Sequence, residues 1–403
     1  MASRTADEVG PITSLMRTIF KNILMHICIT LGVFGNILTL VVLLQKKMRK
    51  TSTAQYLAAL TLFDLIFIIC SFINNVEYIY PQYTKDSVLN PFLNLIFYPL
   101  ADFSSNTSAY LILMFTIERY IAVAYPLHSL YWCRASKARK IIMLTILFTF
   151  LLTFPTFLEN KIVYSWDAAL NTTRPQLVDS QFYPNFKMYK LIYFWLIAVI
   201  VQFIPLTLLI ILNFILLKYI TTSMRNKNTT MGVKNNTANN ATISQENETT
   251  TGASINLIKV TPRGGVNFEV AQKNAKLDEA SKLKKRKQTN TDSQNKATIL
   301  LIATVLVFLV CQLPMALLLI YETIFPIRDK TNKTAIDIVL GLNNIANGLT
   351  AINASVNFIL YSCFSEKFRQ TFSSLFFRTK KSPPIIITNN KYQPIKVNKN
   401  GLS

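Results

Sequence analysis

The sequence carries little charge for its length. Only 15% of its 403 residues are Asp, Glu, Lys or Arg, whereas about 25% is usual for soluble proteins. Acidic residues are fewer than basic ones, at 20 against 42, which gives a formal net charge of +22. A soluble enzyme needs more charged surface, and a nucleic-acid-binding domain places its basic residues on folded surface, not between uncharged runs. We therefore expect neither enzymatic activity nor a nucleic-acid partner.

Long apolar stretches dominate the rest of the chain. A membrane-spanning helix needs about 20 consecutive apolar residues to cross about 30 Å of hydrocarbon. Seven stretches meet or approach this length with at most one charged side chain each: 22–45, 51–76, 87–117, 141–158, 191–217, 297–321 and 338–365. Their length and number exclude the core helices of a globular protein. The sequence predicts an all-α membrane protein, a seven-transmembrane helix bundle over residues 22–365.

Basic residues are distributed unequally between the segments that connect these stretches. When residues 1–21 are placed outside the cell, the inner segments hold 31 of the 42 Lys and Arg residues. Because positively charged loops stay on the cytoplasmic side, we predict a multi-pass plasma-membrane protein with an extracellular N-terminus at 1–21 and a cytoplasmic tail at 378–403. This basic inner face suits anionic membrane lipid and acidic partner surfaces.

Two segments differ from the spans in composition. Residues 221–296 are rich in Asn, Thr and Lys, and such a segment cannot bury enough apolar area to offset the entropy of ordering. We predict a disordered third cytoplasmic loop there. Residues 364–377 place Phe364, Phe368, Phe372 and Phe376 at helical spacing with basic residues between them, which predicts a short amphipathic eighth helix in the membrane interface.

Polar residues inside the predicted spans require an explanation, because a charge at the bilayer centre costs about 2.5–3.5 kcal/mol on insertion scales. Asp64 lies in the second span, and Asn36, Ser108, Asn353 and Asn357 lie in the first, third and seventh. Their oxygen atoms suit a hard monovalent cation or ordered water. Alternatively, they hold the helices together through interhelical hydrogen bonds. Both interpretations indicate one shared polar core.

Several motifs occur in an order typical of one family. They are Gly35-Asn36, Asp64, Glu118-Arg119-Tyr120 followed by Pro126-Leu127, Pro205, Cys311-Gln312-Leu313-Pro314, and Asn357-Phe358-Ile359-Leu360-Tyr361. In these motifs the chain resembles a rhodopsin-like (class A) G-protein-coupled receptor over all seven spans. Each motif is weak alone, whereas their joint order and spacing are highly specific.

This resemblance implies a role in G-protein coupling for one group of residues. In the family, the arginine of the triplet is held by its acidic neighbour and released toward the G protein, a loop after the third helix enters the G protein, and a tyrosine of the seventh helix swings inward. The corresponding residues are Glu118, Arg119, Tyr120, Pro126, Leu127, Asn357 and Tyr361. The implied intracellular partners are a heterotrimeric G protein, arrestin and receptor kinases.

The resemblance also implies an ion site. Asp64, Ser108, Asn353 and Asn357 match the positions of the sodium pocket that favours the inactive state in this family. A Na+ ion at Asp64 is the one inorganic ligand that follows, and no other cofactor is expected.

The sequence departs from the family pattern at several positions. Gln312 stands where Trp is usual, Phe358 where Pro is usual, and Asn213 where Tyr is common. Asn94 occupies the position of the bridging cysteine. The five cysteines of the chain fall in helices or on the reducing side, so we expect no disulfide and a looser ligand entrance.

The ligand class follows from a narrower resemblance. The sixth-span Cys311-Gln312 sequence, Asn213 and the seventh-span motif resemble invertebrate receptors for FMRFamide-like neuropeptides, which implies an extracellular peptide ligand ending in Arg-Phe-amide. A cationic ligand favours acidic partners, and aromatic residues could line the pocket beside them. The candidates near the outer ends are Glu77, Tyr98, Asp102, Phe103, Gln312, Tyr321, Glu322 and Asp337. Each charge among them could instead be a solvated loop charge or a helix-end charge.

Sequons at Asn171 and Asn332 fall in predicted extracellular loops, so we expect glycosylation there. Two other functions stay open at this point. An orphan or non-signalling seven-helix protein that binds another small ligand is suggested by the missing disulfide and by Gln312 and Phe358. A membrane transporter is the second, and the lack of an internal repeat counts against it.

Overall fold

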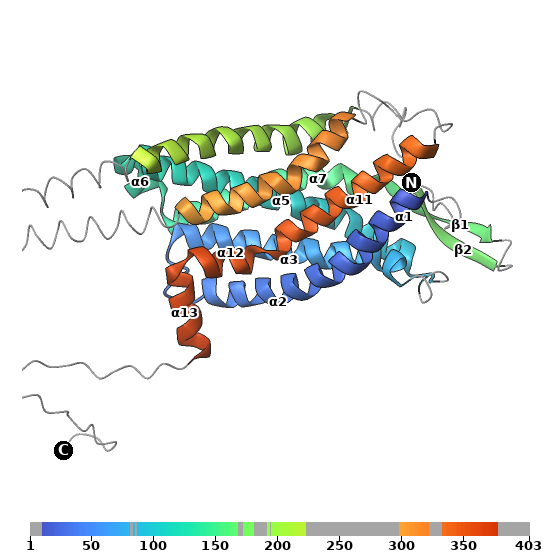
Figure 1. Cartoon of the computed structure of the whole chain (residues 1–403), viewed down its shortest axis with the longest axis horizontal. Coiled ribbons are helices and arrows are strands. Elements are labelled where there is room, and N and C mark those ends of the chain that lie inside the picture. The colour runs from blue at the N-terminus through green and yellow to red at the C-terminus, as the bar shows by residue number, and fades with distance from the viewer. Residues whose placement is uncertain are drawn as a thin grey trace, which may run out of the picture.

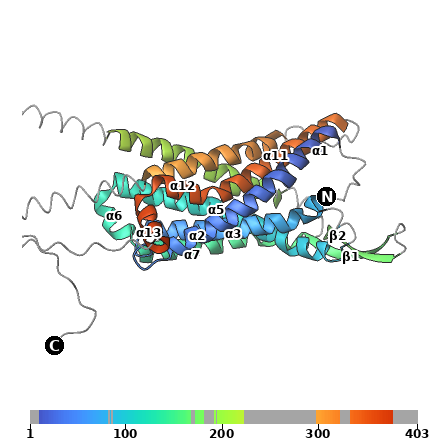
Figure 2. The same ribbon diagram turned by 60° about the horizontal axis from the view of Figure 1, so that its bottom comes forward.

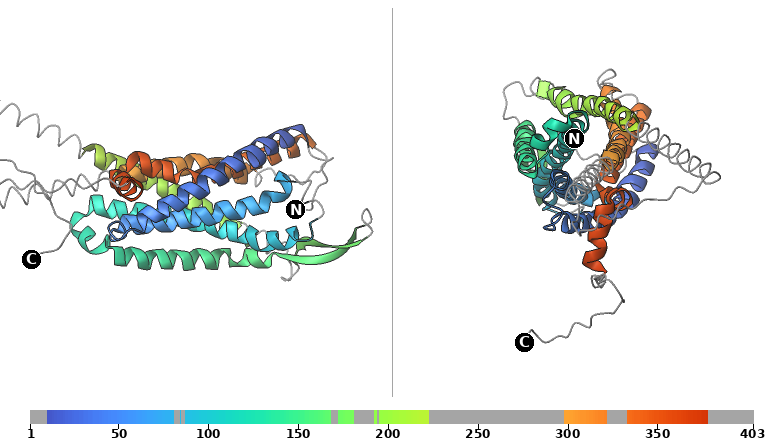
Figure 3. Two further views of the ribbon diagram at one scale, coloured as in Figure 1. Left: turned by 90° about the horizontal axis from the view of Figure 1, so that it is seen from below. Right: turned by 90° about the vertical axis from the view of Figure 1, so that its left-hand side faces the viewer.

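The computed structural model describes residues 10–80, 84, 87–167, 172–180, 192–193, 195–222, 298–321 and 333–377. Within these ranges, seven helices are long and apolar enough to cross a membrane. They lie side by side (Figure 1) and, seen along the bundle, surround a common core (Figure 3, right). The predicted seven-helix bundle is confirmed, and the chain is a multi-pass membrane protein.

The first four spans follow the predicted order. The first consists of α1 (Pro11–Arg17), the π-helical segment η2 (Thr18–Leu24) and α2 (Met25–Leu43). The second is α3 (Ser52–Ile79) and the third is α5 (Asn90–Ala124), which leads into the short helix α6 (Pro126–Trp132). The fourth joins α7 (Ala135–Thr153) to the 3-10 helix η3 (Phe154–Leu158).

The last three spans complete the bundle. The fifth, Trp195–Thr222, contains the π-helical segment η4 (Ala198–Phe203), and the sixth is Thr298–Tyr321. The seventh is α11 (Lys333–Ser355), after which the chain continues into α12 (Asn357–Phe364) and α13 (Glu366–Phe376). Most of the predicted third loop at 221–296, and the tail at 378–403, lie outside the described residues.

The bundle has two distinct ends. At one end, strands β1 (Asn160–Asp167) and β2 (Thr172–Asp179) extend beyond the helices, at the same end of the bundle as the start of α1. At the other end lie α6 and α13, with α13 running across the bundle axis (Figures 1 and 2). We call these the hairpin end and the α13 end.

The hairpin is the one β-structure among the described residues. β1 and β2 pair antiparallel, with Asn160 opposite Asp179 and Asp167 opposite Thr172. The strands are rich in β-branched and aromatic residues such as Ile162, Val163 and Tyr164, which favour extended backbone. The sequence therefore held a local signal for this hairpin, although the prediction was for helices alone.

The first helix begins at Pro11, earlier than the predicted boundary at residue 22. Residues 11–21 include two basic side chains, so they lie outside the uncharged stretch predicted at 22–45. In the structure, Arg17 and Lys21 both lie over the ring of Tyr78, at 4.8 and 4.1 Å from its centroid. Cation–π contacts and the apolar stems of these side chains let the helix carry them.

Close packing joins the first span to the seventh. A Cβ atom on Gly35 would lie 2.9 Å from the Cβ atom of Phe358, so only glycine permits this approach. The chain breaks between α11 and α12 at Val356 even though Phe358 replaces the usual proline. The ring of Phe358 packs against Phe368 and Phe372. The residue that departs from the family pattern thus anchors α13 to the bundle.

Helix α13 is fixed at its start by hydrogen bonds. The Ser365 hydroxyl accepts from the Phe368 amide at 3.3 Å, which caps the helix. Arg369 donates to the Cys363 carbonyl at 2.7 Å, and Phe368 is buried to 1% exposure. These contacts hold an amphipathic helix within the segment predicted at 364–377.

Candidate functional site

A buried carboxylate links the second, third and seventh spans. Asp64 is 3% exposed. One carboxylate oxygen, Oδ1, accepts from the Ser108 hydroxyl at 2.7 Å, and the other, Oδ2, accepts from the Asn357 side-chain amide at 2.5 Å. Asn36 extends the network because its amide donates to the Ala354 carbonyl at 3.0 Å. The polar residues predicted to share one core therefore meet there.

A small cavity of about 10 Å³ opens beside Asp64, which is room for about one water molecule or ion. Its polar lining is oxygen-bearing: Asp64, Ser105, Ser108, Gln312, Thr350 and Asn353. Such a donor set fits a hard monovalent cation better than a transition metal. Gln312, a candidate for the ligand pocket, faces this cavity and is 8% exposed.

A second buried charge group lies at the α13 end of α5. Arg119 and Glu118 form an ion pair at 3.0 Å with both side chains about 6% exposed. The Arg119 guanidinium lies 5.5 Å from the centre of the Phe115 ring, and Tyr56 stacks on the same ring. Within the described residues, Oε2 of Glu118 and Nε of Arg119 have no hydrogen-bond partner. The Glu118–Arg119 ion pair is thus formed, but each side chain keeps one polar atom without a hydrogen bond.

Further unpaired polar atoms lie in the core near this end. Tyr361 is fully buried, and its hydroxyl approaches Thr61 without hydrogen-bond geometry. Asn213, in the fifth span, donates to the Leu209 carbonyl at 2.7 Å, but its side-chain oxygen has no partner among the described residues. A buried polar atom without a partner typically costs about 1–3 kcal/mol, so a rearrangement that pairs these atoms would recover free energy.

The surface at the α13 end carries the exposed residues of the predicted coupling group. Pro126 begins α6, where proline is favoured because the first helical amide needs no partner. Leu127 is 82% exposed, an unusually open position for leucine. Tyr120 packs edge-to-face on Tyr125 at 6.0 Å. An apolar side chain that projects from this end is available for burial by a partner.

The arrangement of spans and motifs agrees with a match to a known family. Residues 35–361 match the model of the 7 transmembrane receptor (rhodopsin family). The chain belongs to the rhodopsin family of seven-transmembrane receptors. This is a family of receptors, not of enzymes. Every residue of the Asp64 and Arg119 groups lies within the matched range.

Curated relatives of this rhodopsin-family chain include peptide receptors. It is 24% identical over 349 residues to the FMRFamide peptide receptor frpr-18 of Caenorhabditis elegans, covering 86% of this chain and 66% of the relative. It is 24% identical over 371 residues to the FMRFamide receptor of Drosophila melanogaster, covering 89% of this chain and 54% of the relative. The thyrotropin-releasing hormone receptor of Gallus gallus is 33% identical over 114 residues, 28% of each chain. The chain thus spans between about half and two thirds of the length of its FMRFamide-receptor relatives.

The candidate ligand residues do not form one cluster. Glu77, Tyr98, Asp102 and Tyr321 are exposed on three different spans near the hairpin end. Phe103 packs edge-to-face between Phe63 and Phe150, at 5.7 and 5.8 Å. These contacts favour a packing role for Phe103. Glu322, and the sequons at Asn171 and Asn332, lie outside the described residues.

Asp337 has structural partners in this fold. Its carboxylate accepts from the backbone amides of Ile12 and Thr13, at 3.0 and 2.8 Å, and its carbonyl accepts from the Thr13 hydroxyl at 2.8 Å. The side chain caps α1 from the seventh span and is 7% exposed. This geometry favours the alternative in which Asp337 is a helix-end charge. Proximity of residues 325 positions apart could not be read from one sequence.

Sequence reasoning did not identify several residues that hold the site. Thr107 and Thr149 share a hydrogen bond at 2.8 Å between the third and fourth spans, and Ser355 donates to the Cys28 carbonyl at 3.2 Å. Threonine and serine in apolar helices are a weak signal for such contacts, because most bond to their own helix. All five cysteines are free thiols in the structure.

Proposed function

We propose that this rhodopsin-family chain is a receptor for an FMRFamide-like neuropeptide and that it activates a heterotrimeric G protein. The observation that carries the proposal is the incompletely paired Glu118–Arg119 group, which lies at the same end of the bundle as the exposed Leu127. A G protein would bury Leu127 and accept the freed guanidinium. The names of the FMRFamide-receptor relatives support the peptide class.

The mechanism is a shift between two arrangements of the core. In the arrangement described, Asp64 joins the second, third and seventh spans, and Arg119 is paired with its neighbour. A peptide that binds the alternative arrangement more tightly shifts the population toward it, by no more than that difference in affinity. The unpaired atoms of Tyr361 and Asn213 favour such a rearrangement.

A sodium ion at Asp64 would oppose this shift. We propose that Asp64, Ser108 and Asn353 hold the ion, with Asn357 orienting the carboxylate. The ion supplies positive charge that stabilises the buried carboxylate. These residues would bind the ion in the arrangement that pairs Arg119, so that the ion and the peptide favour opposite states.

The peptide test uses purified protein with a purified heterotrimeric G protein. Peptides ending in Arg-Phe-amide should accelerate guanine nucleotide exchange, and the same peptides with a free carboxylate should do so much less. The control peptide replaces the penultimate arginine with glutamine and keeps the terminal Phe-amide. The G proteins are first shown to respond to another receptor. If no Arg-Phe-amide peptide then accelerates exchange on any of them, the proposed peptide class is contradicted.

Orientation forms part of the proposal, with the hairpin end outside the cell and the α13 end in the cytoplasm. Cys363 is the exposed thiol at the α13 end. Burial raises the pKa of the Cys133 thiol to about 11, so this thiol stays protonated and reacts slowly at neutral pH. A membrane-impermeant maleimide should label intact cells weakly and opened cells strongly. The variant Cys363→Ser should remove most of the second signal, and strong labelling of Cys363 on intact cells would reverse the orientation.

A further inference from the structure

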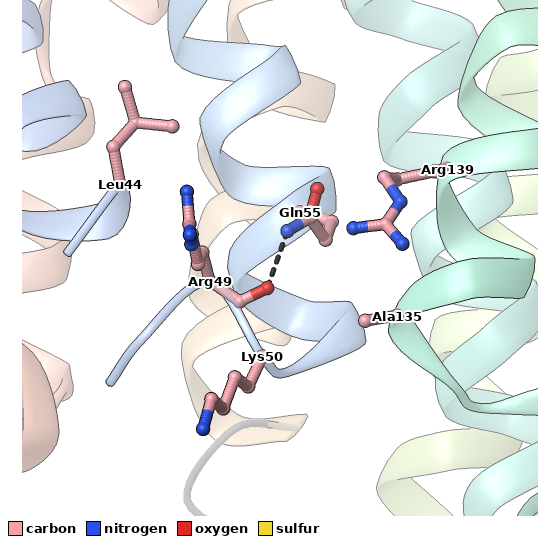
Figure 4. A pocket seen from close by; sticks show the side chains of 6 residues that line it. All are labelled: Leu44, Arg49, Lys50, Gln55, Ala135 and Arg139. Carbon is pink, nitrogen blue, oxygen red and sulfur yellow. Dashed lines mark hydrogen bonds between the residues drawn. The ribbon is translucent and has the colours of Figure 1, made fainter. Parts of the chain in front are cut away.

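A pocket at the α13 end, away from the Arg119 group, is lined mainly by basic and apolar side chains. Its volume is about 640 Å³, and the residues that line it are Leu44, Arg49, Lys50, Gln55, Ala135 and Arg139. They come from the end of α2, the connection to α3, the start of α3 and the start of α7. Figure 4 shows Arg139 pointing from α7 toward Gln55, with Arg49 and Lys50 on the facing side.

The charge of this pocket has one sign. Its lining contains three cations and no carboxylate. Among the described residues, none of these three cations takes part in an ion pair. The loop that presents them is held in place because the Gln55 side-chain amide donates to the Arg49 carbonyl at 2.5 Å. Two guanidinium groups and one ammonium group around one space suit a ligand with several phosphate oxygens.

The position of the pocket places it at the membrane surface. The first span ends at Leu43, the second begins at Ser52 and the fourth begins at Ala135, so the pocket lies where three helices leave the hydrocarbon. Tyr131 and Trp132, which precede Ala135 in the chain by four and three residues, are exposed, and Lys137 lies over both rings. Exposed aromatic and basic residues of this kind mark the headgroup level of a bilayer.

Apolar surface continues from the pocket along the spans. Met143 and Leu147 follow Arg139 by one and two helical turns on α7 and are 65% and 55% exposed. Leu62 follows Gln55 by two turns on α3 and is 45% exposed. Leu44, in the pocket wall, is 58% exposed. The pocket is therefore continuous with membrane-facing apolar surface, which the acyl chains of a lipid whose headgroup lies in the pocket would contact.

We propose that this pocket binds an anionic phospholipid whose headgroup carries more than one phosphate. Arg49, Lys50 and Arg139 bind the phosphates, and the acyl chains lie along Leu62 and Met143. The proposal requires only that the bundle sits in a membrane, and it is independent of the peptide and the G protein assigned above.

The test measures binding of fluorescent phosphatidylinositol 4,5-bisphosphate to the purified full chain in detergent micelles. The pocket variant is Arg49→Gln/Lys50→Gln/Arg139→Gln. The control variant is Lys46→Gln/Lys47→Gln/Lys140→Gln, which removes three charges from the same loop and helix outside the pocket lining. The pocket variant loses direct contacts between its cations and the phosphates and should bind at least about tenfold more weakly. The control loses only diffuse attraction to the anionic headgroup and should bind less than about threefold more weakly.

Competition distinguishes the source of the phosphates. Unlabelled phosphatidylinositol 4,5-bisphosphate should displace the probe, whereas phosphatidylserine and soluble inositol 1,4,5-trisphosphate should displace it poorly. Equal loss in the two triple variants would indicate diffuse charge attraction and overturn the proposal. Equal competition by inositol 1,4,5-trisphosphate would overturn the lipid assignment, and equal competition by phosphatidylserine would overturn the need for several phosphates.

A second measurement avoids dependence on the folding of the triple variant. A photoreactive analogue of the same lipid should cross-link the wild-type chain at residues 44–62 and 135–147. Cross-links confined to other segments would contradict the proposal. The single variant Arg139→Gln, on an exposed helical position, should reduce cross-linking at the α7 segment while retaining the wild-type melting temperature.

Discussion

The two halves of the bundle differ in how their polar residues are used. Toward the α13 end, buried polar groups contact one another, as Asp64 does with Ser108 and Asn357 and as Glu118 does with Arg119. Toward the hairpin end, the described candidate ligand residues are exposed on three spans or, like Asp337, have structural partners. One half is therefore joined by contacts between its polar residues, whereas the other leaves polar side chains exposed.

The largest effect is expected where the connected half meets the G protein. Arg119→Ala should reduce peptide-stimulated nucleotide exchange more than about tenfold, because contacts to a charged group are worth about 1.5–3 kcal/mol. Peptide affinity should change little, since Arg119 lies at the opposite end from the ligand. Lys140→Ala, an exposed cation at the same end, is the control. Full exchange activity in the Arg119 variant would remove the assigned role.

The next effect concerns the exposed leucine of α6. Leu127→Ala should weaken coupling about tenfold, because burying a leucine side chain is worth about 1.5–3 kcal/mol. Leu130→Ala is a matched control on the same helix, with 69% exposure against 82% for Leu127. The measurement is the G-protein concentration needed for half-maximal exchange. If the two variants lost coupling equally, the contact with the G protein would involve the whole of α6 and not Leu127 in particular.

A smaller effect tests the link from Asp64 to the ligand. In the wild type, sodium should lower peptide affinity about fivefold or more, a typical size for coupling between sites. Asp64→Asn should abolish this dependence, and Glu366→Gln, which alters an exposed carboxylate on α13, should retain it. Peptide binding is measured in sodium and in N-methyl-D-glucamine at constant ionic strength. A sodium response that survives in the Asp64 variant would leave Asp64 as interhelical support alone.

The smallest effect sharpens the comparison at the hairpin end. Asp337→Ala should cost about 1 kcal/mol of stability, because it removes the cap of α1. Peptide affinity should stay within about threefold, since less than 1 kcal/mol would be lost. Thermal unfolding and peptide binding are measured on the same preparation, with Lys46→Gln as the exposed control. A large loss of affinity with unchanged stability would return Asp337 to the ligand pocket.

The bundle and its polar core could be predicted because each depends on a local property. Seven apolar stretches determine the spans, and a carboxylate such as Asp64 inside one of them must find partners on neighbouring helices. The order of motifs then assigned those partners. The position of each motif along the chain was enough to predict which residues meet, since the family resemblance implies which spans are neighbours.

Features that depend on contacts distant in sequence were not predictable. The start of the first helix at Pro11 depends on Asp337 and Tyr78, which lie on other spans. The role of Phe358 depends on its contact with Gly35 and with α13. The local sequence suggested a charged, non-helical terminus before residue 22 and the loss of a helix-breaking proline at position 358. In both cases contacts with residues distant in sequence determine the observed structure.

The free thiols have a practical consequence for the hairpin. Its order comes from backbone pairing between Asn160–Asp167 and Thr172–Asp179, while all five cysteines of the chain are unpaired. Pairing of the two strands therefore requires no oxidation step. We expect the hairpin to keep its order when the protein is synthesised and purified under strongly reducing conditions, including cell-free extracts.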